Sequence, residues 1–236
     1  MPVTYAGLSS AGKRKRNEDC FLIKSLGPDR VLFAVADGLG GQPSGHIASL
    51  TAIRAIETLF PGAGLSETEM AGMVLKVDDA VKESAKTDPA LEYMGTTLTV
   101  ALFDKGRVIW AHVGDARLYH LRQRRLSQIT TDQTMAQFLV EEGEITRKEA
   151  LTHPMQHFLA QSLGGGGCEP ESGSFKILPG DIVLLCSDGL YSEIDDDRII
   201  ALLSSQHRIE EKVRLLVKAA DDAGGLDNIT GVCLEF

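Results

Sequence analysis

Short runs of apolar and β-branched residues, bounded by Gly, Asp or Pro, recur in both halves of the chain. Such runs are typical of strands that are buried on at least one face. They predict strands near residues 3–9, 19–24, 31–36, 95–103, 107–113, 116–122, 173–178, 181–187 and 229–235. The segments FDKGRV and LPGD separate neighbouring strands and carry residues that turns prefer. The pattern therefore predicts a chain dominated by antiparallel strands.

Helical periodicity interrupts the strands in two places. Apolar residues recur at helical spacing over 47–59 and again over 70–81, between the third and fourth predicted strands. A second pair of helices is predicted over 195–204 and 208–223, and the first of these begins with acidic residues that suit a helix N-terminus. Two helix pairs inserted among strands predict an α+β fold in which helices cover antiparallel sheets.

The stretch 130–167 follows neither pattern for long. Short helical patterns at 134–142 and 146–152 precede a run of glycines at 164–167. We interpret this stretch as a flap-like insertion beside the functional site. The length of 236 residues suits one domain, so we expect residues 1–236 to form a single unit around one core.

Charge and cysteine content narrow the class of protein. The net charge of −9 argues against a main affinity for nucleic acid, because binding of the phosphate backbone needs a basic face. The four cysteines form no C-x-x-C pair and suit reduced thiols in the cytosol. No apolar run has the length of a signal peptide or a membrane span. We therefore expect a cytoplasmic protein without membrane insertion.

Acidic residues stand repeatedly at the ends of predicted strands. AVADGLGG places Asp37 directly after one apolar run, and LLCSDGL places Asp188 after another; each is followed by a glycine. The full set of acids in such positions is Glu18, Asp19, Asp37, Asp115, Asp188 and Asp227. One Asp-Gly pair alone is more often simple turn chemistry. The recurrence of this arrangement points to a common site.

Crowded carboxylates repel one another, which raises their pKa values unless a cation neutralises them. Convergence of these acids therefore predicts bound metal ions. Oxygen donors without a cluster of His or Cys suit magnesium, manganese or calcium better than zinc or copper. Gly38 and Gly189 fit this reading, because a residue without Cβ leaves room for a backbone carbonyl to approach a metal or a water.

Six motifs occur in order along nearly the whole chain: RKRNED, VADGLGGQPSG, GTTLTVALF, HVGDARLYHL, LLCSDGL and DNITGVCLEF. Together they resemble the metal-dependent protein serine/threonine phosphatases of type 2C in their compact bacterial form. The resemblance implies a four-layer α/β/β/α sandwich of two antiparallel sheets flanked by antiparallel helix pairs. It also implies a site for two magnesium or manganese ions in a cleft at one edge of the sandwich.

The resemblance assigns roles to the acids that would bind the metals directly. Asp37 would bridge the two ions, and the carbonyl of Gly38 would bind one of them. Asp188 and Asp227 would hold the other ion. Arg14 matches the arginine that binds phosphate in the family, and a guanidinium offers phosphate oxygens two parallel donors that lysine lacks.

Three further acids receive outer roles from the same resemblance. Glu18 and Asp19 match acids that act through water in the outer shell. Asp115, in GDAR, matches the acid that binds a third, weaker metal together with the residue at the Asp188 position. No nucleophilic side chain is implied, since a water that bridges two ions attacks phosphorus directly.

The chain also departs from the family pattern. Gln42 stands where relatives commonly carry a histidine proposed to protonate the leaving oxygen, and glutamine cannot act as a general acid at neutral pH. His46 is the nearest replacement, although a lone histidine is more often a surface or packing residue. In the flap, we interpret Asp132 and His153 as structural support rather than as groups that take part in the chemistry.

The leading hypothesis is a protein phosphatase that hydrolyses phosphoserine and phosphothreonine. Two alternatives remain open: a catalytically weak phosphoprotein-binding module, suggested by Gln42, and a phosphatase of a small phosphorylated metabolite. The expected partners are phosphorylated proteins, a cognate serine/threonine kinase and the substrates of that kinase. We expect a monomer that recognises its substrates through basic patches at 13–16 and 122–125, because the overall charge repels anionic proteins.

Overall fold

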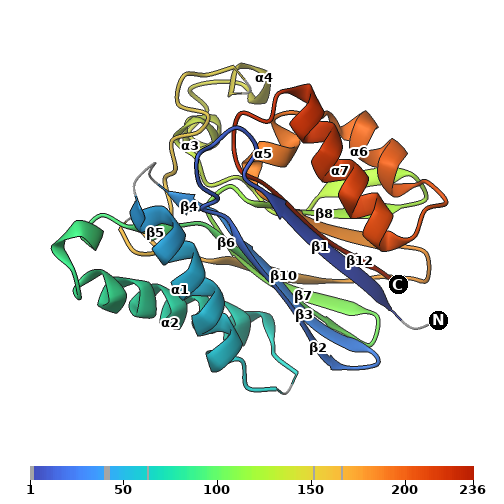
Figure 1. Cartoon of the computed structure of the whole chain (residues 1–236), viewed down its shortest axis with the longest axis horizontal. Helices are drawn as coiled ribbons and strands as arrows, with labels where there is room; N and C mark the ends of the chain where they lie inside the picture. The colour runs from blue at the N-terminus through green and yellow to red at the C-terminus, as the bar shows by residue number, and fades with distance from the viewer. Residues whose placement is uncertain (1–2, 40–42, 63, 151, 166) are drawn as a thin grey trace.

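The protein is a sandwich of two five-stranded antiparallel sheets (Figure 1). The computed structural model describes residues 3–39, 43–62, 64–150, 152–165 and 167–236. The first sheet has the order β1 (Thr4–Ser10), β12 (Ile229–Glu235), β11 (Ile182–Cys186), β8 (Arg117–Arg122) and β9 (Arg125–Gln128). The second sheet has the order β10 (Glu171–Lys176), β7 (Arg107–Val113), β6 (Leu98–Asp104), β3 (Arg30–Ala36) and β2 (Cys20–Gly27). The predicted α+β sandwich is confirmed.

Strand β3 shows why the central strands are apolar without alternation. Val31, Phe33 and Val35 point into the core between the two sheets. Leu32 and Ala34 point to the opposite face and pack beneath helices. Because successive side chains of a strand point to opposite faces, a strand covered on both sides needs apolar residues at every position. The strand ends at Ala36, so Asp37 is the first residue after this doubly buried segment.

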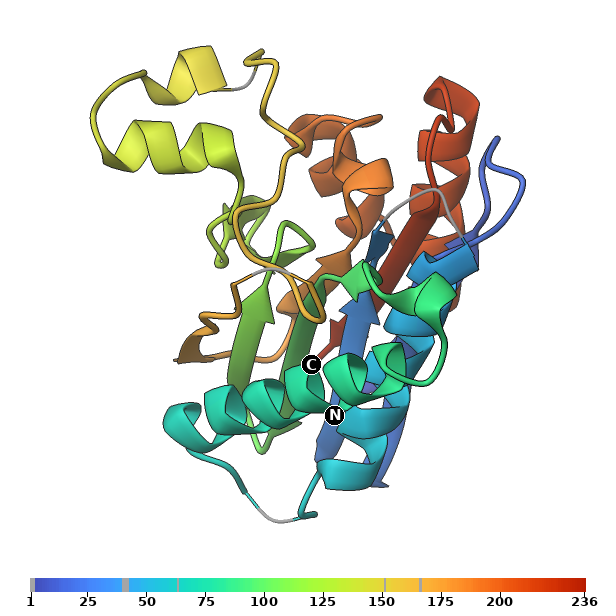
Figure 2. The ribbon, with the colours of Figure 1, turned by 90° about the vertical axis from the view of Figure 1, so that its left-hand side faces the viewer.

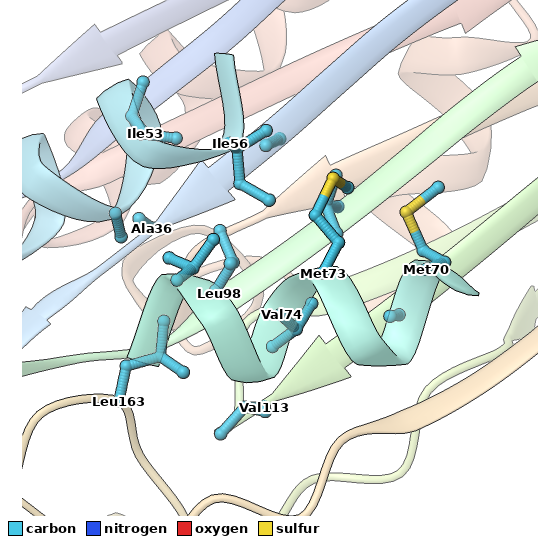
Figure 3. Close-up of a cluster of buried hydrophobic side chains, with 14 of the residues drawn as sticks. Ala36, Ile53, Ile56, Met70, Met73, Val74, Leu98, Val113 and Leu163 are labelled. Carbon is cyan, nitrogen blue, oxygen red and sulfur yellow. The ribbon is translucent and has the colours of Figure 1, made fainter. Parts of the chain in front are cut away.

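Two helix pairs form the outer layers. Helices α1 (Pro43–Leu59) and α2 (Glu67–Ala85) cover the second sheet, and Figure 3 shows Ile53 and Ile56 of α1 beside Met70 and Met73 of α2. Helix α2 begins at a capping box in which the side chains of Ser66 and Glu69 each bind the other's backbone N–H. Helices α6 (Asp196–Leu203) and α7 (Ile209–Ala223) cover the first sheet.

The predicted strand over 95–103 is interrupted at Thr97. Its first part, β5 (Gly95–Thr96), leaves the large sheet and pairs with the two-residue strand β4 (Gly38–Leu39). The interruption arises because Thr97 is bonded elsewhere: its backbone N–H donates to the Asp37 carbonyl at 2.8 Å. Its hydroxyl also accepts from the Asp37 N–H at 3.0 Å.

Strand β9 and helix α5 (Asp188–Tyr191) were not predicted either. Strand β9 extends the first sheet by a short hairpin, and helix α5 begins directly after β11 and Ser187. The segment after β11 turns into a helix because Ser187 adopts an extended N-cap conformation and the backbone bonds of the next turn are helical. Asp188 therefore lies at the first position of a helix instead of in a loop.

The segment between β9 and β10 stands away from the sheets (Figure 2). It carries the short helices α3 (Met135–Glu141) and α4 (Arg147–Ala150), and the second is shorter than the predicted 146–152. Its root is fixed by Gln133, whose N–H donates to the Gly114 carbonyl at 2.7 Å while its side-chain oxygen accepts from the Gly114 N–H at 2.9 Å. Across the described ranges, no helix has both the length and the apolar composition that a bilayer crossing requires.

We predict that Gly114→Ala destabilises the fold by about 2–4 kcal/mol. Gly114 has a φ of +107°, and a Cβ there would lie 2.6 Å from the Thr97 methyl carbon. The matched control is Gly72→Ala in α2, where a Cβ meets no atom within 4 Å. Replacement of a helical glycine there should stabilise by up to about 1 kcal/mol. Urea denaturation with chelator present measures both changes, and equal stabilities for the two variants would contradict the prediction.

Candidate metal centre

The two sheets deliver acidic side chains to the same edge of the sandwich. Asp37 follows β3 of the second sheet, and Asp188 follows β11 of the first. Their charges interact: the pKa of Asp37 is raised well above its ordinary value, first by burial and then by the charges of Asp19 and Asp188. The predicted convergence of acids from separate strands is therefore observed in the structure.

The backbone of Asp37 is held by neighbouring threonines. The Asp37 carbonyl accepts from the Thr97 N–H at 2.8 Å and from the Thr96 hydroxyl at 2.8 Å. The Thr97 hydroxyl accepts from the Asp37 N–H at 3.0 Å. Since both backbone groups are bonded, the carboxylate direction is set by a rigid main chain rather than by a loop.

Burial and mutual repulsion disfavour the ionised form of several carboxyls. Burial raises the pKa of Asp19 to about 6, and hydrogen bonds from two hydroxyls oppose this rise. Burial also raises the pKa of Asp188, with a further contribution from the charge of Asp227. The pKa of Asp115 is raised well above its ordinary value by burial and then by the charge of Asp188. Four acids thus share an environment that a cation would relieve.

Asp19 is the most enclosed of these acids, with 5% of its surface exposed. Its Oδ2 accepts from the Ser187 hydroxyl at 2.7 Å and from the Thr230 hydroxyl at 2.6 Å. Its Oδ1 is buried and has no hydrogen-bond partner among the described residues. A buried acceptor without a donor is costly and points to a ligand or a water at that position.

The structure shows a steric reason for glycine at positions 38 and 189 that the sequence did not suggest. A Cβ at Gly38 would collide with the backbone carbonyl of Gly45, and a Cβ at Gly189 would collide with the carbonyl of Asn228. The free space beside each glycine is therefore taken by neighbouring main chain. The glycines allow close packing of the segments that carry the acids.

The loop at residues 11–18 is attached to the start of β12. Asn228, which is 5% exposed, donates to the carbonyls of Ala11 and Arg16 and accepts from the Glu18 N–H. Arg14 donates through Nη2 to Asp227 Oδ2 at 2.7 Å and through Nε to the Leu226 carbonyl at 3.2 Å.

Arg14 and Asp227 contact each other, which the sequence did not suggest. The two side chains form an ion pair whose members are 53% and 40% exposed, so its own contribution to stability is small. The guanidinium uses two of its N–H groups in these contacts and keeps others that face solvent. Asn228 is a further residue that the sequence reasoning missed, although its position in DNITG next to Asp227 was visible.

The arrangement of donors fits hard divalent cations. Within the described ranges, no three His, Cys, Asp or Glu side chains are gathered into a group that could hold an ion by themselves. This agrees with the repulsion among the acids, and with an expected ligand set that includes the Gly38 carbonyl and waters. The donors near Asp37 are oxygens, which magnesium and manganese prefer. The unpartnered Asp19 Oδ1 adds a buried acceptor beside them.

The flap contributes a residue that received no role from the sequence. His157 Nδ1 lies 4.0 Å from Asp188 Oδ2. Nothing in HPMQHF distinguishes this histidine from His153, because only the folded path of the flap brings it to Asp188. His153 instead accepts from the Met155 N–H at 3.2 Å, which supports the local turn as expected.

Asp132 supports the root of the flap through an arginine. Arg117 donates to both carboxylate oxygens of Asp132 at 2.7–3.1 Å and stacks over the Tyr191 ring at 3.5 Å. The Tyr191 hydroxyl donates to the Asp115 carbonyl at 3.1 Å. The flap root and the Asp115 loop therefore share one rigid set of contacts.

The remaining sequence predictions fall outside this centre. Gln42 lies outside the described residues. His46 is exposed and its Nδ1 lies 4.0 Å from the sulfur of Cys20. The basic patch at 122–125 lies at the far end of β8, because Arg117 pairs with Cys186 at the near end. Five strand positions separate the two ends by about 17 Å, so this patch does not border the acids.

Comparison with known proteins gives one consistent result. A family model described as protein phosphatase 2C matches residues 6–223. The serine/threonine protein phosphatase PstP of Mycobacterium tuberculosis is 38% identical over 239 residues, which span 100% of this chain and 45% of the relative. The chain thus spans about half the length of this relative. The serine/threonine phosphatase stp of Listeria welshimeri is 32% identical over 94% of this chain and 91% of its own length.

Solved structures agree with the sequence matches. The crystal structure of the M. tuberculosis phosphatase PstP/Ppp superposes with a TM-score of 0.89 at 36% identity, covering 100% of this chain and 99% of that one. The catalytic domain of PstP in complex with two manganese ions superposes with a TM-score of 0.85 at 36% identity, covering 99% and 98%. The chain belongs to the protein phosphatase 2C family.

Proposed function

We propose that this chain is a metal-dependent protein phosphatase that hydrolyses phosphoserine and phosphothreonine. The observation that carries the proposal is the convergence of buried acids from both sheets on Asp37, whose pKa is raised by burial and by the neighbouring carboxylates. Family membership and the two manganese ions named for the PstP catalytic domain support the same activity. We further propose that residues 1–236 act as one catalytic domain.

Asp37 is the proposed bridging ligand of two manganese or magnesium ions, and the Gly38 carbonyl is a ligand of one of them. Asp188 and Asp227 are the proposed ligands of the other. Two divalent cations held by these residues would supply the chemistry for hydrolysis by water, because they would lower the pKa of a nearby water and polarise the phosphate.

The outer residues hold this arrangement in place. Asp19, fixed by two hydroxyl donors, is proposed to orient ligand waters with its free oxygen, and Glu18 is proposed to act in the same shell. Asp115 is proposed to hold a third, weaker ion together with Asp188, because burial and then the charge of Asp188 raise the pKa of Asp115. Arg14 is proposed to bind the substrate phosphate with the N–H groups that Asp227 and Leu226 leave free.

The proposed partners follow from the activity. They are phosphorylated proteins and the serine/threonine kinase whose marks the enzyme removes, and we expect the phosphatase to act as a cytoplasmic monomer. Of the two basic patches suggested by the sequence, only the one at 13–16 adjoins the acids. The patch at 122–125 lies too far along β8 to contact a bound phosphate.

We predict that the purified protein releases phosphate from a phosphothreonine peptide with manganese or magnesium and not with chelator. Asp37→Asn should lower kcat by more than about 100-fold, since loss of an outer-shell partner alone costs 10–100-fold. Asp29→Asn, an exposed aspartate in the β2–β3 turn, is the matched control.

The same assay separates the alternatives. A fully active Asp37→Asn protein would refute the proposed role of this carboxyl. A folded wild type that binds the peptide without turnover would favour the binding module. A much higher specific activity on a phosphorylated metabolite than on peptides would favour the small-molecule phosphatase.

We predict that, with chelator present, Asp19 makes stability fall as the pH rises from about 4 to about 6. The folded state keeps the Asp19 proton up to a pKa of about 6, whereas the ordinary value is 3.8. The folded state therefore binds more protons in this window, and the free energy of unfolding declines with pH by about 3 kcal/mol. Urea denaturation of the wild type and of Asp19→Asn isolates this contribution as the difference between them.

Manganese should oppose this decline at pH 7, because a cation favours the ionised carboxyls and binds only the folded state. Asp37→Asn should gain less stability from manganese than the wild type does. Equal pH dependence of the wild type and Asp19→Asn in chelator would contradict the proposed electrostatics.

We predict that Arg14→Lys lowers kcat/KM for the phosphothreonine peptide by about 10- to 100-fold. The substitution keeps the charge but removes the planar pair of donors, and a hydrogen bond to a charged group contributes about 1.5–3 kcal/mol. Steady-state kinetics beside Arg16→Lys, an exposed neighbour, provide the test. Equal kcat/KM values for the two variants would show that the loop merely carries surface charge.

A further inference from the structure

A cavity lies between the flap and the first sheet, next to the candidate metal centre. Its volume is about 670 Å³. One wall comes from β9 and the segment that follows it, including Gln128 and Thr131, and the opposite wall comes from α3 and α4, including Gln137 and Arg147. This volume lies within the range of sites that hold ligands much larger than a phosphate group.

Two residues connect this cavity to the metal centre. His157 lines the cavity, and its Nδ1 lies 4.0 Å from Asp188 Oδ2. Tyr191 also lines it, and its hydroxyl donates to the Asp115 carbonyl at 3.1 Å. If the phosphorylated residue of a substrate peptide lay at the acids, the neighbouring residues of that peptide would therefore lie beside the cavity.

One ion pair, Arg117–Asp132, lies in the wall of the cavity. Arg117 and Asp132 neutralise each other through bonds of 2.7–3.1 Å, and Tyr191 lies flat against the guanidinium at 3.5 Å. Arg117 also donates to the Tyr119 hydroxyl at 2.7 Å. Arg117 is held by these partners, and the Arg117–Asp132 pair is a fixed part of the wall without net charge.

Arg147 gives the cavity its excess positive charge. It lines the cavity from α4 and is exposed. In the part of the chain that the structure describes, no acidic side chain forms an ion pair with it. Among the residues that line the cavity, two arginines against one aspartate leave one positive charge, in a protein whose net charge is −9. An anionic group is the complement of this wall.

We propose that the cavity binds the peptide segment next to the phosphorylated residue and that Arg147 selects an acidic side chain in that segment. This inference rests on the proposed phosphatase function and adds a determinant of substrate choice to it. The Gln137 side-chain oxygen and the Thr131 hydroxyl supply polar groups for the peptide backbone, since the Gln137 amide donates to Glu141 and the Thr131 N–H donates to Glu171.

The test uses phosphothreonine peptides that differ only by Glu, Gln or Lys at single positions on either side of the phosphothreonine. Glu should lower KM relative to Gln by about 3- to 5-fold at one or two adjacent positions on one side, as expected for a partly exposed ion pair. Arg147→Ser should abolish this difference. Arg147→Glu should transfer the preference to the peptide with Lys at the same position.

Lys148→Ser is the matched control, because it removes the same charge from the same short helix at a residue that does not line the cavity. It should keep the preference for Glu. p-Nitrophenyl phosphate has no flanking peptide, so all three variants should hydrolyse it as the wild type does. A preference that is absent in the wild type, or that Arg147→Ser and Lys148→Ser change equally, overturns the inference.

A binding measurement keeps this inference separate from the proposed activity. Fluorescence anisotropy of the labelled peptides, with chelator present to prevent turnover, should show the same order of affinity, with Arg147→Ser weakening only the Glu peptide. Activity on p-nitrophenyl phosphate without any peptide preference would refute the subsite alone. Selective binding of the Glu peptide by a protein that hydrolyses neither substrate would refute the proposed function and leave the subsite in place.

Discussion

Repulsion among buried carboxylates is the constraint on which the rest of this structure depends. Asp37 and Asp188 come from different sheets, and burial together with their neighbours' charges raises the pKa of each. Without bound cations, the repulsion among the acids lowers the stability of the folded state, so the rest of the fold must hold the acids together. The double-sided burial of β3 and the threonine contacts of Asp37 provide that rigidity.

The need to hold the acids in place against their repulsion explains why many contacts around them involve the backbone. Asn228 joins the loop at 11–18 to the start of β12 through three hydrogen bonds, and this brings Arg14 beside Asp227. Gly38 and Gly189 let main-chain segments approach closely at the points where the acids project. Main-chain contacts at Asp37 and hydroxyl donors at Asp19 therefore hold these acids in place, so that little adjustment is needed when a cation binds.

The sequence predicted those features that depend on local pattern. Apolar runs that end at Asp37 and Asp188 marked the strands and the carboxylates at once, and both helix pairs followed from periodicity. It could not predict contacts between distant segments: the hydroxyls of Ser187 and Thr230 that hold Asp19 are 168 and 211 positions away along the chain. The approach of His157 to Asp188 depends in the same way on the path of the flap.

Two features that the sequence did not predict have a shared cause. The break at Thr97 and the close packing of main chain at Gly38 both reflect which main-chain groups are neighbours in space, and side-chain patterns carry no such information. The basic patch at 122–125 shows the same difficulty for charge, since only the register of β8 against β11 reveals that it lies at the far end of the sheet. The residue types indicated the kind of chemistry, whereas the pairing of the strands determines where each charged residue lies.

The flap and the candidate metal centre are joined through one block of residues. Gln133 binds both backbone groups of Gly114, which precedes Asp115, and Tyr191 joins the Asp115 carbonyl to the face of Arg117. The wall that holds Asp115 beside the acids is thus also the floor of the cavity beneath the flap. Because the two sites share rigid parts, the flap can vary its exposed face, including Arg147, without moving the carboxylates. In the proposed function, substrate choice and hydrolysis would use separate surfaces of the same block.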